Sequence, residues 1–171
     1  IETDIEIFTN RHDSKKILIT GTNGKSSVCS MLEKILTNND FKAKAMGNIG
    51  LPVLDCIEES LDYSLIEVSS FHLKISNNLY CDVAIILNIT EDHLDYHETF
   101  EDYLITKNSI FKKAKVRIGN EANKRDISEV DILFNTHNLE IEEQNLNAIK
   151  AILKSLNLEI DLTNSLENYS K

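Results

Sequence analysis

Residues 16–27, KILITGTNGKSS, decide the fold of this chain. The run at residues 16–20 is typical of a short β-strand, and residues 21–25 form a loop that contains Gly21 and Gly24. The residues that follow, as far as Thr37, carry apolar side chains three and four positions apart, which is the spacing of an amphipathic helix. A strand, a glycine loop and a helix in this order predict a phosphate-binding unit, because backbone amides and the helix N-terminus point at the anion.

The loop between this strand and this helix carries the side chains that nucleotide binding requires. We expect Lys25 to reach the outer phosphates and the hydroxyl of Ser26 or Ser27 to bind Mg²⁺. The full pattern has glycine at the position of Ile19, so this loop is a shortened variant, GxxGKS. An ordinary glycine-rich turn capped by serine is the alternative, but the strand, glycines, lysine, hydroxyls and helix all agree with a phosphate loop. The expected nucleotide-binding residues of the loop are Gly21, Thr22, Asn23, Gly24, Lys25, Ser26 and Ser27.

Strands and helices are expected to alternate along the chain. The first residues, IETDIEIF, alternate in polarity and are expected to form an edge strand. The run CDVAIILNI is almost continuously apolar, as in a parallel strand that is buried on both faces. This alternation predicts an α/β fold with a mostly parallel sheet flanked by helices. Further strands are expected at residues 63–68, 81–89, 116–118 and 131–134, and helices at residues 26–37, 100–111 and 141–156.

Bulk composition narrows the possible functions. The 171 residues have the length of one domain and a net charge of -10, which disfavours nucleic acid as a partner because Lys and Arg must neutralise its phosphates. Acidity is compatible with Mg²⁺ chemistry, since carboxylates bind this metal. The sequence has neither an apolar run of membrane-spanning length nor a signal peptide, so a cytoplasmic protein without a membrane partner is expected. Three widely spaced cysteines are expected to be reduced and buried: Cys29, Cys56 and Cys81.

Polar residues follow the ends of two expected strands. Glu67 lies near the end of the strand at 63–68, and His93 lies in the turn TEDHLD after the strand at 81–89. Ligands of open α/β sheets bind at the carboxyl ends of strands, where a carboxylate or a neutral imidazole can hold a metal. The alternatives are a solvated glutamate and a surface histidine in an acidic turn. No cluster is visible around His12, His72, His97 or His137.

Four motifs in order resemble the Mur ligase family. They are GTNGKSS, GNIGLPVLD at residues 47–55, IEVSSFHL at 66–73 and LNITEDHLDYH at 87–97. The conjunction of the four is specific, and DIEIF at residues 4–8 resembles the family segment before the phosphate loop. The resemblance is dense from Asp4 to about Phe111. It implies a P-loop-type central ATP-binding domain at residues 1–162 and a polar tail at 163–171 that leads towards an absent C-terminal domain, with the N-terminal UDP-binding domain also absent.

Within the family, GNIG combined with SSF is similar to the members that add D-glutamate to UDP-N-acetylmuramoyl-L-alanine in peptidoglycan biosynthesis. There, ATP phosphorylates the substrate carboxylate, and the amino group of D-glutamate attacks the acyl phosphate to give amide, ADP and phosphate. The resemblance implies an ATP-dependent ligase that uses Mg²⁺, here as a monomeric ATP-binding fragment that is inactive alone. The alternatives are another Mur ligase or a folylpolyglutamate synthase-like enzyme, and a P-loop module that binds nucleotide without catalysis.

The resemblance also implies roles for single residues. Lys25 would contact the phosphates, and Ser26 or Ser27 would bind one Mg²⁺ together with Glu67. From spacing alone Lys107 is an ordinary helix lysine, but in the family this lysine is carbamylated and binds a second Mg²⁺ with the residue that corresponds to His93. The expected catalytic residues are Lys25, His93 and Lys107.

Substrate and adenine contacts depart partly from the family pattern. Asn48 and Ser69 are similar to positions that touch the muramoyl substrate, and His72 stands where the family usually has Gln. The adenine element is usually His-Asn-x-x-Asn at the start of a helix, and residues 143–147 read EQNLN here. The last position matches the pattern, so the resemblance implies an adenine contact for Asn147.

Overall fold

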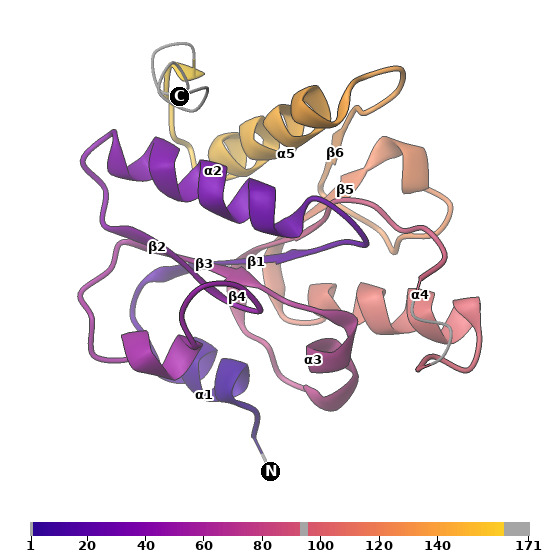
Figure 1. Cartoon of the computed structure of the whole chain (residues 1–171), viewed down its shortest axis with the longest axis horizontal. Helices are drawn as coiled ribbons and strands as arrows, with labels where there is room; N and C mark the ends of the chain where they lie inside the picture. Colours follow the sequence, from indigo (N-terminus) through magenta and orange to yellow (C-terminus); the bar gives the residue numbers. More distant parts are fainter. Residues whose placement is uncertain (1, 93–95, 163–171) are drawn as a thin grey trace.

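A six-stranded sheet, parallel throughout, runs through the centre of the chain (Figure 1). The computed structural model describes residues 2–92 and 96–162. The order of the strands in the sheet is β2-β3-β1-β4-β5-β6, so β1 lies between β3 and β4. Because all of them run the same way, their carboxyl ends meet at one edge, where ligands of such sheets bind. The strands are β1 Lys15–Thr20, β2 Ala43–Gly47, β3 Tyr63–Glu67, β4 Cys81–Ile86, β5 Ala114–Asn120 and β6 Ile132–Phe134.

Helices cover both faces of the sheet (Figure 1). Successive residues of β1 alternate between two cores: Ile17 and Ile19 pack beneath α2 and α5, while Leu18 packs against the opposite layer. Burial on both faces explains why the central strands are apolar at almost every position. On one face lie α2 (Lys25–Thr37) and α5 (Ile141–Ser155), and on the other lie α1 (Asp4–Arg11), α3 (Ser70–Ile75) and α4 (Phe100–Asn108). Three short 3₁₀ turns are Val53–Cys56, Ser109–Phe111 and Glu121–Asn123.

The connections that follow the central strands diverge. α2, which follows β1, lies on one face of the sheet, whereas α3 and α4, which follow its neighbours β3 and β4, lie on the other. Connections that leave adjacent strands in opposite directions open a crevice at the carboxyl ends of those strands. The loop at residues 21–24 begins at this point, so the fold places the expected phosphate loop at the ligand-binding edge.

The predicted fold class is confirmed, and most of the expected strands and helices are present. The strand expected at residues 81–89 ends at Ile86, and the helix expected at 100–111 ends at Asn108 before a 3₁₀ turn. The expected tail at residues 163–171 lies outside the described residues. The predicted burial of the cysteines is confirmed, and all are free thiols: Cys29, Cys56 and Cys81.

The first residues form a helix, so the predicted edge strand is wrong. Thr3 caps α1: its side chain accepts a hydrogen bond from the Glu6 backbone N–H, and the Glu6 carboxylate accepts one from the Thr3 N–H. Such a capping box satisfies backbone donors in the first helical turn. Ile5 and Phe8 then pack together into one core, whereas a strand would send residues three apart to opposite faces.

Two short elements have no clear pattern in the sequence. β2 consists of AKAMG, a run too short and too weakly apolar to predict a strand. Its neighbour β3 supplies the hydrogen-bonding partners that make it one, with Gly47 paired to Glu67 in register. α3 has six residues and depends on a cap at Ser69. Both elements border the carboxyl edge of the sheet and therefore shape the site.

Candidate functional site

The phosphate loop joins β1 to α2 at the carboxyl edge of the sheet. Gly24 precedes α2 with a φ of +85°, a left-handed conformation that glycine adopts without strain. The Lys25 ammonium lies across the loop and donates to the carbonyl oxygens of Gly21 at 2.9 Å and Thr22 at 3.1 Å. Strand, loop and helix are therefore arranged as the sequence predicts, with a cation held over the loop.

Asn88, just after β4, holds the loop in place. Its side chain accepts from the Asn23 backbone N–H at 2.8 Å and donates to the Asn23 carbonyl oxygen at 3.0 Å. Its own carbonyl oxygen accepts from the Thr22 N–H at 3.0 Å. Asn88 acts across 65 residues of sequence, which is why no local pattern predicts it. The loop is thus fixed before any ligand arrives.

Glu67 is the centre of a polar cluster beside the loop. It is 2% exposed, so it is not the solvated strand-end glutamate that was the alternative. Its Oε2 accepts from the Ser26 hydroxyl at 2.7 Å, and its Oε1 accepts from the Asn48 amide at 3.0 Å. The structure therefore brings together three residues expected at the site, from the ends of β2 and β3 and the start of α2. Of the two serines left open by the sequence, Ser26 is the one that contacts Glu67.

Gly47 ends β2 directly against Glu67, and the space there is closed to a side chain. Its φ is +100°, and a Cβ at this position would lie 2.6 Å from the Glu67 carbonyl oxygen. Gly47→Ala is therefore expected to lower the free energy of unfolding by about 2–3 kcal/mol, since backbone strain and the clash add together. The measurement is urea denaturation.

Gly50→Ala is the matched control for this prediction. Gly50 also has a positive φ, +61°, but the nearest atom to its added Cβ is at 3.7 Å. This variant should lose about 1 kcal/mol, from strain without a clash. Equal losses in the two variants would contradict the closed space beside Glu67.

Lys107 is buried beneath the phosphate loop, so the interpretation from spacing alone as an ordinary helix lysine is wrong. It is 2% exposed. Its ammonium donates to the Thr20 hydroxyl at 3.1 Å and to the Gly21 carbonyl oxygen at 2.9 Å. Burial, together with the nearby charge of Lys25, lowers the pKa of Lys107 to about 7. Near neutral pH a large fraction of this amine is therefore uncharged, which makes it a nucleophile.

Tyr103 connects Lys107 to the loop. Its ring lies 5.3 Å from the Lys107 ammonium, and its hydroxyl lies 3.1 Å from the Thr22 hydroxyl. The Thr22 hydroxyl in turn donates to the Thr90 carbonyl oxygen at 3.2 Å. The one signal for Tyr103 in the sequence is its place four residues before Lys107, on the same face of the helix.

A cavity of about 220 Å³ lies between the phosphate loop and α3. Its wall combines a cation from the loop with groups from the ends of several strands. The cavity adjoins Lys107, so loop and buried amine face one space. The lining residues are Gly21, Thr22, Lys25, Asn48, Ser69, Ser70, Phe71, Asp92, Tyr103 and Lys107. His93, which the sequence predicts here, lies outside the described residues.

Ser69 and His72 contact each other at the start of α3. The Ser69 hydroxyl lies 3.1 Å from Nδ1 of His72 and accepts from the His72 backbone N–H at 3.3 Å. Ser69 lines the cavity, and His72 lies behind it as its capping partner. Ser69 therefore faces the cavity in which its predicted substrate contact would be made. The substrate contact of His72 stays a prediction.

Asn147 does not line the cavity. Its amide donates to the Asn135 carbonyl oxygen at 2.9 Å, which fastens the loop between β6 and α5. Its neighbour Asn145 lies closer to the phosphate loop, since its Oδ1 would be 3.0 Å from a Cβ on Gly24. α5 thus borders the phosphate loop, and the adenine contact of Asn147 stays a prediction.

Two absences among the described residues bear on the expected site. Residues 2–92 and 96–162 contain no group of three or more His, Cys, Asp or Glu side chains arranged to hold a metal ion. The pair formed by Ser26 and Glu67 is instead a hydroxyl and a carboxylate, which are oxygen ligands of the kind that Mg²⁺ takes. Across the same ranges, no helix has the length and apolar character that a membrane crossing requires.

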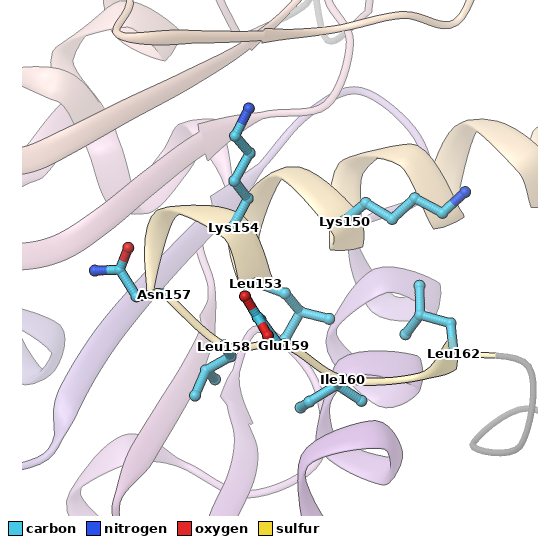
Figure 2. Close-up of a pocket in the computed structure, with 8 residues that line it drawn as sticks. All are labelled: Lys150, Leu153, Lys154, Asn157, Leu158, Glu159, Ile160 and Leu162. Atoms are coloured by element: carbon cyan, nitrogen blue, oxygen red, sulfur yellow. The ribbon is translucent and has the colours of Figure 1, made fainter.

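A second pocket, of about 390 Å³, lies at the far end of α5 (Figure 2). Leu153 of α5 and the segment after it form its apolar wall, while the long side chains of Lys150 and Lys154 extend from the helix. This pocket shares no residue with the cavity at the phosphate loop. We place the functional site at the smaller cavity because a loop with backbone donors, a lysine and a buried carboxylate converge there.

Comparison with known proteins agrees with this geometry. A family profile described as the Mur ligase middle domain matches residues 19–166. The chain belongs to the Mur ligase family. The resemblance drawn from the four motifs is thereby confirmed, and the match extends well past Phe111, where the motifs become thin.

Two curated relatives of this Mur ligase domain carry the same name. The chain is 47% identical over 117 residues to UDP-N-acetylmuramoylalanine--D-glutamate ligase of Buchnera aphidicola subsp. Schizaphis graminum, a match that covers 68% of the chain and 27% of the relative. A ligase of the same name from Thermotoga sp. is 39% identical over 108 residues, which are 63% of the chain and 25% of the relative. The chain thus spans about a quarter of the length of these relatives.

Solved structures of a Mur ligase and of FolC have the same fold. MurF ligase from Thermotoga maritima in complex with ADP superposes with a TM-score of 0.73 at 14% identity, and the match covers 98% of this chain and 53% of that one. FolC of E. coli in complex with DHPP and ADP gives a TM-score of 0.64 at 17% identity, covering 96% and 59%. At these identities the likeness shows a shared fold.

Proposed function

We propose that this Mur ligase domain binds ATP and Mg²⁺ in an enzyme that joins D-glutamate to UDP-N-acetylmuramoyl-L-alanine during peptidoglycan biosynthesis. The names of the curated relatives support the reaction. The observation that carries the proposal is the contact between Ser26 and Glu67 directly beside a phosphate loop. It supports ATP as the phosphoryl donor, because such a loop and an oxygen pair for Mg²⁺ are the parts that phosphoryl transfer needs.

The residues at the loop fit Mg²⁺. Ser26 offers a hydroxyl oxygen and Glu67 a buried carboxylate, 2.7 Å apart, and Mg²⁺ prefers such hard oxygen ligands. Asn48 donates to the other carboxylate oxygen and so fixes the orientation of Glu67. When bound, the metal would neutralise charge on the transferred phosphoryl group. Ser26 and Glu67 would hold it, with Ser27 as the alternative hydroxyl.

Lys25 and the loop backbone would position the phosphates. An ammonium has three donors, and Lys25 uses two of them on the Gly21 and Thr22 carbonyl oxygens. The third can meet a phosphate oxygen without release of the other two. The loop amides and the start of α2 would accept the remaining negative charge. Transfer to the substrate carboxylate would give an acyl phosphate, which the amine of D-glutamate then attacks.

Lys107 is proposed to be carbamylated. A neutral amine attacks carbon dioxide, a C–N bond forms, and a proton leaves to solvent, which gives a carbamate with one negative charge. The pKa of about 7 supports this step, because the amine is neutral often enough to react. The carbamate would serve with His93 as the ligand pair for a second Mg²⁺.

The remaining proposed roles rest on the family pattern. Asn48, Ser69 and His72 would contact the muramoyl substrate, and Asn147 would contact adenine. We further propose a cytoplasmic protein that acts as a monomer, without nucleic acid or membrane as partners. A folylpolyglutamate synthase-like activity is the nearest alternative. A product assay with UDP-N-acetylmuramoyl-L-alanine and D-glutamate, on a protein of the relatives' length that carries this chain, separates the two.

Nucleotide binding is tested with the variant Lys25→Ala. Loss of a charged phosphate contact should cost about 1.5–3 kcal/mol, or roughly tenfold to a hundredfold in affinity for Mg-ATP. Calorimetric titration of the chain with Mg-ATP measures it. Lys150→Ala removes the same charge from an exposed position of α5 and should leave the affinity unchanged. Tight binding that Lys25→Ala does not weaken would overturn the proposed role of the phosphate loop.

A further inference from the structure

His97 lies buried at the centre of an aromatic cluster that joins α3 to α4. The side chain is fully buried. Its ring centroid lies 5.1 Å from those of Tyr96 and Tyr103 and 6.4 Å from that of Phe71. Phe71 belongs to α3 and Tyr103 to α4, and both line the cavity at the phosphate loop. His97 thus contacts residues of two walls of the proposed site and does not itself line the cavity.

One ring nitrogen of His97 has no hydrogen-bond partner. Nδ1 lies 3.3 Å from Oδ2 of Asp102, whereas Nε2 is the one buried side-chain nitrogen or oxygen among the described residues that lacks a partner. The ammonium of Lys74, with a contribution from His97, holds the pKa of Asp102 below its usual range. Asp102 is therefore a carboxylate that can only accept, so Nδ1 of His97 donates the hydrogen bond to it.

An unpartnered polar atom in a core costs stability, and a phenylalanine of similar shape would avoid that cost. Compared with a phenyl ring, the imidazole of His97 has one useful additional group, the N–H that donates to Asp102. Asp102 also accepts from Lys74 of α3 at 2.9 Å. The hydrogen bond between Asp102 and His97 therefore fixes the imidazole ring between α3 and α4. Tyr103 packs against the ring in this orientation.

The position of Tyr103 matters to the phosphate loop. Its hydroxyl lies 3.1 Å from the Thr22 hydroxyl, and its ring lies 5.3 Å from the Lys107 ammonium. Any rotation of the His97 ring would move the surface on which Tyr103 rests. Contacts therefore run from Asp102 through His97 and Tyr103 to Thr22.

We infer that His97 is a positioning residue, which through its hydrogen bond to Asp102 and its contact with Tyr103 sets the place of Thr22 in the phosphate loop. The consequence for nucleotide binding rests on the proposed function, whereas the consequence for the loop itself does not. The two can therefore fail separately.

Two variants of this chain test the inference with opposite changes. His97→Phe keeps the ring but loses both nitrogens, so its midpoint of urea unfolding should equal or exceed that of the native chain. His97→Asn keeps an N–H near the place of Nδ1 but loses the ring, so it should be less stable. We expect the backbone amide signal of Thr22 in ¹H–¹⁵N spectra to shift in both variants, because each loses one of the two contacts, and to shift in His97→Phe without any loss of stability. The affinity for Mg-ATP should fall about tenfold in His97→Phe, as for a lost hydrogen bond to a charged group.

A purely structural role predicts a shifted Thr22 signal only in the less stable variant, His97→Asn. That result, or an unchanged Thr22 signal in His97→Phe, would overturn the inference. Ile105→Ala, at an exposed position of α4, is the control and should leave the Thr22 signal in place. If the native chain binds no Mg-ATP, the proposed function fails, and the Thr22 signal still decides the role of His97.

Discussion

Lys107→Met is expected to raise the free energy of unfolding at pH 7 by about 3 kcal/mol, because it removes a buried group that resists protonation. Burial lowers the pKa of this lysine from 10.5 to about 7. Between these values the unfolded chain binds a proton that the folded chain does not, so stability falls as pH falls through this window and the penalty is complete below about pH 7. A lowering of this size corresponds to on the order of 5 kcal/mol.

The hydrogen bonds lost with the amine offset little of this gain. The Gly21 carbonyl oxygen keeps its bond from Lys25, and the Thr20 hydroxyl keeps its bond to the Val68 carbonyl oxygen. Methionine has a similar length and no charge, so it fills the space without a buried cation. The stabilised variant would also lack the amine that the proposed carbamate needs.

Urea unfolding at pH 7 and pH 10, in buffer free of carbon dioxide, measures this effect. The gain in Lys107→Met should be large at pH 7 and should shrink towards pH 10, which lies close to the pKa of the unfolded amine, so that removal of its proton on folding costs little there. Lys112→Met changes an exposed lysine at the end of the same helical segment and should show no such pH dependence. A gain that is equal at both pH values would show that packing, and not the charge of Lys107, is responsible.

Glu67→Gln is expected to weaken binding of Mg-ATP by roughly tenfold to a hundredfold or more. Replacement of a residue that only orients a metal ligand already lowers metal affinity by this factor, and Glu67 is proposed to be a ligand itself. The fold should survive. Glutamine keeps a carbonyl oxygen for the Asn48 amide, and its NH₂ can donate to the Ser26 hydroxyl, which can accept as well as donate. The free energy of unfolding should therefore change far less than the affinity.

Calorimetric titrations with and without Mg²⁺ check this prediction. Affinity for ATP in the absence of the metal should be nearly the same in Glu67→Gln and the native chain. Glu142→Gln removes the same charge from an exposed position at the start of α5 and serves as the control. If Glu67→Gln weakened binding equally with and without Mg²⁺, Glu67 would not be a metal ligand.

The parts of the fold that sequence predicts are those with strong local patterns. β1, the phosphate loop and α2 follow from one run of residues, and β4 follows from its apolar continuity. The N-terminal helix does have a local signal. Ile5 and Ile7 suggest the alternation of a strand, but Thr3 and Glu6 have the spacing of a capping box, and the structure forms it. β2 could not be predicted, because its pairing with β3 and not its own composition makes it a strand.

The candidate site divides in the same way. Lys25, Ser26 and Glu67 lie where motif and strand-end reasoning put them. No local pattern predicts the contacts of Asn88, Tyr103 and His97. Each acts on residues that are brought close by the order of the strands in the sheet and by packing between helices. The burial of Lys107 likewise depends on tertiary packing, so its spacing in the helix alone predicts an ordinary helix lysine.

The free thiols of the core have a practical consequence for fluorescence work. Burial raises the pKa of Cys81 to about 12 and also raises those of Cys29 and Cys56. Maleimide dyes react with the thiolate, so the native chain should stay dark after labelling at pH 7. A single cysteine introduced at exposed Ile105 would then carry the only dye. Motions of α4 could be followed in single molecules without removal of any native cysteine.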